Sequence, residues 1–250
     1  MAARVLLIED DPSIARFVEL ALEELPGHDA AAPPIELQQA ASLAQAREAL
    51  AGGGWQLVIS DLMLPDGSAE TLLAEGAALG DGAPAWLVFS AGVHDDRHLA
   101  LAARGVARTL RKPVPLLELL DSVAELLRGR AAPPSPGPAA EDGEGDPVQR
   151  HFGGDRAMFE AFRDGCIQRF ADDLAQGDAA LAAGDAAALR RVAHGLKAVL
   201  ALIGHPRLAA MARALEDAAA AGADPAGHAA DWAQLAQGLL ALGATRHPAP

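Results

Sequence analysis

The sequence has a single cysteine, few basic residues and no long apolar run. Cys166 alone cannot form a disulfide framework, so a reducing compartment is expected, and its apolar helical neighbours favour a small buried side chain. Lys and Arg number 20 against 34 Asp and Glu, which gives a net charge of −14. Because phosphate contacts need clustered basic residues, this balance argues against nucleic acid as a partner.

Signals for membrane insertion or secretion are also missing. The longest stretch without Asp, Glu, Lys or Arg is 232–245, which is too short and too polar for a spanning helix. Residues 1–10 lack the charged, apolar and small-residue order of a signal peptide. A soluble cytoplasmic protein with no membrane partner is therefore expected.

The length of 250 residues suits two ordinary domains, and a change in composition separates them. Residues 131–146, AAPPSPGPAAEDGEGD, combine proline, glycine and acidic residues without apolar periodicity, which is typical of a flexible linker. The expected domains are residues 1–130 and 147–250. The first has 19 acidic and 10 basic residues and the second 11 and 10, so the acidity belongs mainly to the first domain.

The first domain alternates short apolar runs with helical patterns, which predicts an α/β fold. A parallel, doubly wound sheet with right-handed crossovers follows from five such βα units, and we expect the flavodoxin-like strand order 2-1-3-4-5. Pro26 and Gly27 are expected to stop the first helix. The expected strands cover residues 4–8, 35–39, 57–61, 85–89 and 107–110, and the last helix covers 115–127.

Polar residues follow four of the five expected strands, at the ends that open on one edge of the sheet. Strands one and three are neighbours in the expected order, about 4.8 Å apart, so the carboxylates after them should crowd together. Such crowding requires a cation or a proton, and Mg²⁺ suits oxygen ligands of this kind. The residues are Glu9 and Asp10 after strand one, Asp61 after strand three, Ser90 after strand four and Lys112 after strand five.

These residue types suit phosphoryl transfer. Asp61 would attack phosphorus to form an acyl phosphate, the Lys112 ammonium would neutralise the transferring oxygens, and the Ser90 hydroxyl would donate a hydrogen bond to one of them. Taken singly, each residue has an ordinary explanation: a turn or cap for Asp61, a helix N-terminal charge for Glu9 and Asp10, a turn for Ser90, and solvated surface for Lys112. Their joint placement favours the site.

Residues 4–128 resemble the receiver domain of bacterial response regulators. The resemblance is carried by Glu9-Asp10-Asp11, Asp61 with Pro65 and Gly67 downstream, Ser90-Ala91 and Lys112-Pro113. It implies phosphorylation of Asp61 by a histidine-phosphorylated donor. It also implies Mg²⁺ held by Asp10, Asp61 and the Met63 carbonyl, with Glu9 assisting through water.

One position departs from the receiver pattern. Receiver domains often have an aromatic residue three positions before the lysine, and Thr109 stands there in this sequence. In such domains a hydroxyl is usually coupled to this aromatic ring. Here Ser90 has the hydroxyl, but position 109 has no ring.

The second domain shows only helical spacing, which predicts an all-α four-helix bundle with short connections. The four expected helices cover about 155–181, 186–203, 206–221 and 228–242. On the second of these, His194 lies off the buried stripe, with Arg190 and Lys197 on the same basic, otherwise small-residue face. A solvent-accessible histidine between cations is suited to phosphorylation. We expect an ordinary surface position for the remaining candidates, which are His98, His151, His205 and His228.

Residues 150–243 resemble the histidine-containing phosphotransfer (HPt) domain. The matching residues are Ala193-His194-Gly195-Leu196-Lys197, Gly204, and Leu215-Glu216 on the following helix, whereas Ala198 stands where the family usually has glycine. The resemblance implies that His194 accepts and donates phosphoryl groups, with Lys197 beside it.

Together these observations indicate a two-component phosphorelay signalling protein. No glycine-rich nucleotide loop is evident, so a separate histidine kinase or another phosphorelay protein must supply the phosphoryl group, and a downstream response regulator would receive it. The competing hypothesis is a non-catalytic interaction protein that uses the receiver fold and the bundle as docking modules.

Overall fold

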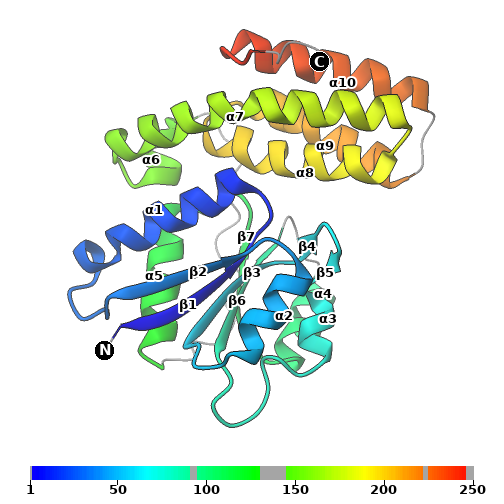
Figure 1. Ribbon diagram of the computed structural model, residues 1–250. Helices are drawn as coiled ribbons and strands as arrows, with labels where there is room; N and C mark the ends of the chain where they lie inside the picture. The colour runs from blue at the N-terminus through cyan, green and yellow to red at the C-terminus, as the bar shows by residue number, and fades with distance from the viewer. Residues whose placement is uncertain (1, 91–94, 130–144, 222–224, 246–250) are drawn as a thin grey trace. The chain divides into compact units, whose positions relative to one another are not determined.

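The computed structural model describes residues 2–90, 95–129, 145–221 and 225–245 of the chain (Figure 1). The chain separates into two compact units, Met1–Glu141 and Asp142–Pro250. Of the linker expected at 131–146, residues 131–144 lie outside the described residues. The two units are called the first and the second unit below.

The first unit contains a five-stranded sheet of order β2-β1-β3-β6-β7, and every neighbouring pair in it is parallel. This is the flavodoxin-like order that the sequence predicts, with one strand contributed by each βα unit. The central strands are apolar on both faces because helices cover both sides of the sheet. The strands are β1 (Ala3–Ile8), β2 (Ile35–Ala40), β3 (Leu57–Asp61), β6 (Ala85–Ser90) and β7 (Val106–Arg111).

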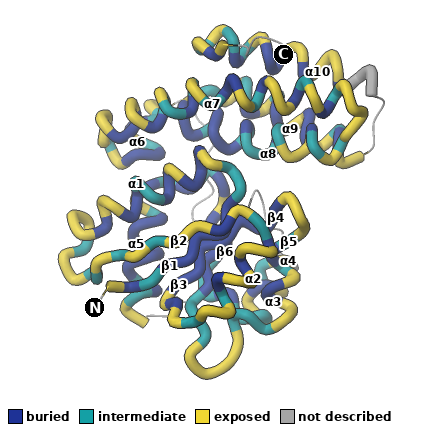
Figure 2. The backbone as a smooth tube through the Cα atoms, viewed as in Figure 1, coloured by how far each residue is buried: buried dark blue, intermediate teal, exposed yellow. Residues whose placement is uncertain are grey.

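Five helices form the outer layers of the first unit. Helices α1 and α5 cover one face of the sheet, and α2, α3 and α4 cover the other (Figure 1). Residues that alternate along each strand therefore enter two separate cores, and Figure 2 shows the central strands buried between them. The helices are α1 (Pro12–His28), α2 (Leu43–Ala51), α3 (Glu70–Ala74), α4 (Asp95–Ala103) and α5 (Leu116–Leu127).

Helix α1 begins where the sequence predicts and ends later than expected. The Asp11 carboxylate accepts hydrogen bonds from the amides of Ser13 and Ile14, which caps the first turn. The helix continues through Pro26 to His28, so the predicted stop at Pro26 is wrong. A proline in the final turn removes only one backbone hydrogen bond of the helix. The Asp29 amide closes the helix by donating to the Leu25 carbonyl at 2.8 Å.

A short hairpin after Asp61 is absent from the sequence prediction. It pairs β4 (Met63–Leu64) with β5 (Gly67–Ser68) in antiparallel register. Gly67 has φ of +144°, and a Cβ atom at this position would lie 2.8 Å from Leu43 Cδ1. The backbone conformation therefore favours glycine, and a larger residue would also displace the end of the Leu43 side chain.

In the described part of the second unit every regular element is a helix, and the four expected helices are present as α7 (Arg156–Ala183), α8 (Ala186–Leu202), α9 (Pro206–Ala220) and α10 (Pro225–Ala241). Helix α7 ends at Gly184 with φ of 65°, and the next residue, Asp185, caps α8 by accepting from the Ala188 amide. An additional short helix, α6 (Pro147–Phe152), was not predicted.

Helices α7 and α10 approach each other closely at one glycine. A Cβ atom at Gly177 would lie 2.1 Å from the Trp232 ring, so only glycine permits this contact. The Trp232 indole N–H donates to the Asp178 carboxylate at 2.8 Å, which satisfies the polar atom of this buried ring.

Candidate functional site

The first candidate site is formed where β1 and β3 end, because these strands are direct neighbours in the sheet. One carboxylate oxygen from each of Glu9, Asp10 and Asp61 lies within 4.8 Å of the others. Glu9 and Asp61 are buried, and Asp10 is half-buried. The crowding that the sequence predicts is therefore present in the structure.

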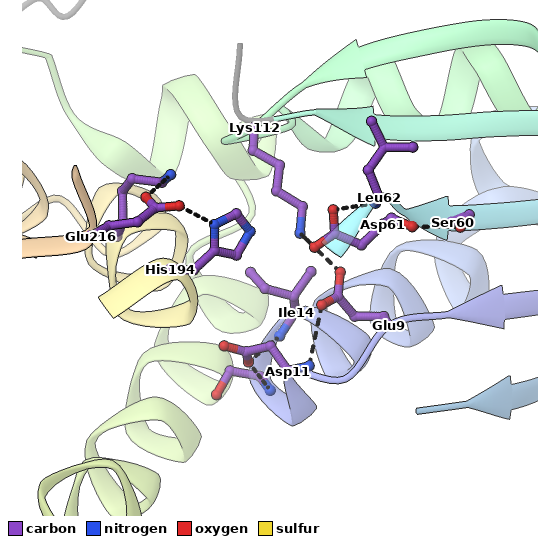
Figure 3. Close-up of polar contacts among 11 residues, drawn as sticks. Glu9, Asp11, Ile14, Ser60, Asp61, Leu62, Lys112, His194 and Glu216 are labelled. Atoms are coloured by element: carbon purple, nitrogen blue, oxygen red, sulfur yellow. Dashed lines mark hydrogen bonds and ion pairs between the residues drawn. The ribbon is translucent and has the colours of Figure 1, made fainter. Parts of the chain in front are cut away.

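Lys112, which follows β7, brings a positive charge into this carboxylate cluster (Figure 3). Its Nζ atom lies 2.9 Å from Asp61 Oδ2 and 3.0 Å from Glu9 Oε2, and both ion pairs are buried. The sequence thus placed Lys112 correctly beside Asp61, although a lysine after a strand is more often solvated surface.

Burial and charge act against each other at the Lys112 ammonium. Burial by itself would lower the pKa of Lys112, but Asp61 and Glu9 outweigh it and raise this pKa above its usual value. Burial raises the pKa of Glu9, although Lys112 opposes the rise. Burial, together with the Asp61 charge, also raises the pKa of Asp10. Lys112 therefore stays charged, and the raised pKa values of Glu9 and Asp10 mean that crowding and burial disfavour negative charge on these two carboxyl groups.

This donor set fits a hard divalent cation. Three carboxylate groups converge from two strands, and oxygen ligands of this type are those that Mg²⁺ takes in proteins. Met63, whose carbonyl is the fourth expected ligand, begins β4 two residues beyond Asp61.

Two further expected positions border this site. Ser90 is the last residue of β6, where its backbone pairs with Arg111 beside Lys112, but its side chain lies outside the described part of the structure. Thr109 is buried in β7 and pairs with Val88. The position at which receiver domains often carry an aromatic ring is therefore filled by a small buried side chain.

Asp66 has a role in this loop that the sequence analysis missed. Its carboxylate accepts hydrogen bonds from the Leu43 amide at 2.8 Å and the Ala44 amide at 3.0 Å, at the start of α2. These bonds, the one from Leu43 above all, lower the pKa of Asp66. The turn signal Asp66-Gly67 was visible in the sequence, whereas its contact with a helix 22 residues earlier was not. Asp66 ties the loop after Asp61 to α2.

The second candidate site lies between α8 and α9. His194 Nδ1 is 2.7 Å from Glu216 Oε1, and the Lys197 ammonium donates to Glu216 Oε2 at 2.5 Å (Figure 3). The sequence predicts a solvent-accessible His194, but only 14 % of its side chain is exposed. This correction has a local cause, since the neighbouring helix brings the Glu216 carboxylate against the ring.

Glu216 remains ionised in this site. Burial would raise its pKa, but the hydrogen bonds from His194 and Lys197 outweigh that effect and lower the pKa to about 2. In the sequence, Glu216 belongs only to the pattern that resembles the HPt domain, and no role for it is evident there. No signal at helical spacing connects it to His194, because the two residues lie on different helices.

Two of the other histidines differ from their expected surface positions. His151 and His228 are both buried, whereas His98 and His205 are partly exposed. His151 lies on α6, the helix that the sequence did not predict, and is buried there with Val148 and Phe152. Cys166 is buried within α7, as expected.

One comparison with known proteins concerns the second unit only. Residues 161–245 match the Hpt domain family. This range contains His194, Lys197 and Glu216, and it lies within the second unit.

The chain also resembles the response regulator protein PilR of Pseudomonas aeruginosa, with 29 % identity over 160 residues. The match covers 64 % of this chain and 32 % of that protein, so the chain spans about a third of the length of this relative. Together with the parallel sheet and its acidic edge, these findings support a receiver domain followed by an Hpt domain.

Two solved structures resemble part of this chain. The signal receiver domain of an HD domain-containing protein from Pseudomonas fluorescens Pf-5 has 26 % identity and a TM-score of 0.43, and the match covers 52 % of this chain and 89 % of that chain. A two-component response regulator from Clostridium difficile has 21 % identity and a TM-score of 0.43, and the match covers 50 % of this chain and 96 % of that chain.

Within the described residues, we find no helix with the length and apolar character needed to cross a membrane.

Proposed function

We propose that this protein carries phosphoryl groups in a two-component phosphorelay, on Asp61 in the receiver unit and on His194 in the Hpt unit. The observation that carries the proposal is the contact between the buried Asp61 carboxylate and the Lys112 ammonium, at an edge where two further carboxyl groups converge. A docking surface has no need of three crowded carboxylates and a buried lysine, because such a cluster is costly to bury.

At the receiver site, one Asp61 oxygen attacks the phosphorus of a phosphohistidine on a donor protein. The new O–P bond forms as the N–P bond breaks, and the imidazole of the donor leaves with the electron pair. Lys112 neutralises part of the charge on the transferring oxygens, and the Ser90 hydroxyl donates a hydrogen bond to one of them.

A magnesium ion is part of this proposal. Asp10, Asp61 and the Met63 carbonyl would hold it, with Glu9 assisting through water. When bound, the ion supplies positive charge that offsets the repulsion between the Asp61 carboxylate and the anionic phosphoryl group. The three converging carboxyl groups support this assignment.

At the Hpt site, His194 would exchange phosphoryl groups with the aspartate of a receiver domain. The partners are a histidine kinase or another phosphorelay protein as donor, and a downstream response regulator as acceptor. A cytoplasmic location stays a prediction, which rests on the single cysteine and the character of the partners.

Labelling with acetyl phosphate separates this proposal from the docking alternative. Wild-type protein should incorporate a hydroxylamine-sensitive phosphoryl group in the presence of Mg²⁺, and Asp61→Asn should incorporate none. Asp121→Asn is a suitable control because its carboxylate is largely exposed on α5. If wild-type protein and Asp61→Asn both remain unlabelled with acetyl phosphate and with a phosphorylated kinase, the docking alternative is favoured.

A further inference from the structure

The β4–β5 hairpin that follows Asp61 is attached to the start of α2 through Asp66. We propose that Asp66 is a positioning residue for the proposed metal site, which holds this hairpin and with it Met63 in place, so that Mg²⁺ affinity depends on the contact with α2. Asp66 is not itself one of the proposed ligands. The inference rests on the metal assignment of the proposed function and extends it to a helix outside the carboxylate cluster.

The hairpin continues directly from the carboxylate cluster. The Leu62 amide donates to Asp61 Oδ1 at 2.6 Å, and Met63, the next residue, begins β4. The Ala69 amide donates to the Leu62 carbonyl at 3.0 Å and closes the hairpin at its base. Within the hairpin, Met63 pairs with Ser68. A displacement of the hairpin would therefore carry Met63 with it.

Asp66 lies in the turn of this hairpin and attaches it to a separate element. Its two carboxylate oxygens accept from two successive amides, Oδ1 from Leu43 at 2.8 Å and Oδ2 from Ala44 at 3.0 Å. These are the first two amides of α2, which have no partner inside the helix, so no helical hydrogen bond is lost. Since both oxygens are bonded, the carboxylate cannot rotate without losing a contact.

An apolar contact supports the same attachment. The Leu43 side chain lies so close to Gly67 that a Cβ atom there would be 2.8 Å from Leu43 Cδ1. Leu43 and Leu64 are buried in one apolar core, which also contains Leu62 and Ala69. The start of α2 is therefore bonded to the hairpin through backbone amides and packed against it through a side chain.

Helix α2 has a second cap whose hydrogen bond does not involve the hairpin. The Ser42 hydroxyl accepts from the Gln45 amide at 3.2 Å. Ser42→Ala and Asp66→Ala each remove one cap from the same helix, but only Asp66→Ala releases the hairpin. A difference in Mg²⁺ affinity between these two variants therefore reports the attachment and not the stability of α2.

The test measures Mg²⁺ binding to the full-length protein by calorimetric titration. Asp66→Ala should weaken binding about fivefold, at the lower end of the usual range for coupled sites, because Asp66 is exposed to solvent. Ser42→Ala should bind Mg²⁺ as wild type does. Asp66→Asn loses the charge but keeps an oxygen that can accept from Leu43, so its affinity should stay within about twofold of wild type.

Amide hydrogen exchange provides a readout that requires no phosphorylation. Without metal, the Leu43 and Ala44 amides should exchange faster in Asp66→Ala than in wild type. Mg²⁺ should slow the exchange of these two amides in wild type, because coupling between two places is reciprocal. This effect of Mg²⁺ should be missing in Asp66→Ala.

Equal Mg²⁺ affinity in wild type and Asp66→Ala would overturn the positioning role. The role is also wrong if Asp66→Asn binds as weakly as Asp66→Ala, which would assign the effect to charge, or if Ser42→Ala does, which would assign it to the helix. Failure of wild type itself to bind Mg²⁺ would instead overturn the metal assignment of the proposed function.

Discussion

Both candidate sites contain a lysine and a carboxylate, but these groups contact one another in a different order. At the receiver site the lysine touches the proposed acceptor directly, as Lys112 does Asp61. At the Hpt site the lysine touches a carboxylate, and that carboxylate touches the proposed acceptor, as Lys197, Glu216 and His194 do. An anionic nucleophile needs positive charge beside it to approach a phosphoryl group, whereas a neutral imidazole needs orientation and a counter-charge for the cation it becomes.

The sites also differ in how the chain assembles them. Glu9, Asp61 and Lys112 come from three strands and are separated by more than a hundred residues from first to last, so the receiver site exists only when the sheet is complete. The Hpt site comes from two consecutive helices, and its ends are 22 residues apart. Substitutions in α8, in α9 or in their connection should therefore affect the Hpt site. Substitutions that disturb any part of the sheet should affect the receiver site.

The largest expected effect is the loss of label when an acceptor is removed. With a single phosphorylated kinase as donor, His194→Gln should label on Asp61, and Asp61→Asn should lose the hydroxylamine-sensitive label completely. The acid-labile, base-stable label on His194 distinguishes flow between the sites. If it is present in wild type and missing in Asp61→Asn, phosphoryl groups pass from Asp61 to His194. Equal His194 label in both proteins would mean that the Hpt site draws on another donor.

The second effect is an acid sensitivity of the second unit between pH 6.5 and about 4. Burial, aided by Arg150, lowers the pKa of His151 from 6.5 to about 4. The unfolded chain then binds a proton below pH 6.5 and the folded chain only near pH 4, so stability is full above pH 6.5 and falls between these values. The expected loss is about 3 kcal/mol.

Amide hydrogen exchange in the second unit measures this loss. His151→Leu, which cannot titrate, should reduce the pH dependence and leave the smaller part that comes from His205, whose pKa burial also lowers, whereas His98→Gln in the first unit should not change it. Glu216, whose pKa is lowered to about 2, adds a further loss only between pH 4.5 and 2. Matching slopes for wild type and His151→Leu would contradict the assignment.

The third effect concerns the direct lysine contact. Lys112→Ala should reduce the rate of Asp61 phosphorylation by about tenfold, a factor equivalent to about 1.4 kcal/mol and typical of one lost charged hydrogen bond. Arg111→Ala is the matched control, because Arg111 is exposed and adjacent in sequence. Similar behaviour of the two variants in a stopped labelling time course would remove Lys112 from the site.

The smallest expected effect is on metal affinity. Asp10→Asn should weaken Mg²⁺ binding severalfold, since one of three converging carboxylates loses its charge. Calorimetric titration of wild type and Asp10→Asn measures this change, and equal affinities would speak against the proposed ligand set. His194 variants should leave Mg²⁺ affinity unchanged, which makes metal dependence a property that separates the two sites.

Sequence patterns were sufficient where one regular element determines the position of a side chain. Apolar runs place Asp61 and Lys112 at strand ends, and the parallel order then brings those ends to one edge. Helical spacing likewise predicts that His194 and Lys197 share a face of α8.

Contacts between elements were less accessible to the sequence. Glu216 meets His194 only because α8 and α9 pack at a particular register, and Asp66 caps a helix whose first residue precedes it by 23 residues. Helix α6 has only six residues, too few for a periodic pattern, and His151 was misplaced on the surface for that reason. Pro26 is an error of another kind. The sequence indicates that the helix stops there, but α1 accommodates this proline in its final turn.

The contact between Gly177 and Trp232 has a consequence for how this bundle can vary. With Trp232 in place, alanine at 177 meets the indole ring at a distance no carbon atoms adopt, and with glycine in place, a smaller residue at 232 leaves a void of nearly a whole ring. A single substitution at either position alone is therefore unfavourable. An exchange to alanine at 177 therefore becomes tolerable only together with a smaller side chain at 232, so the two positions should change as a pair.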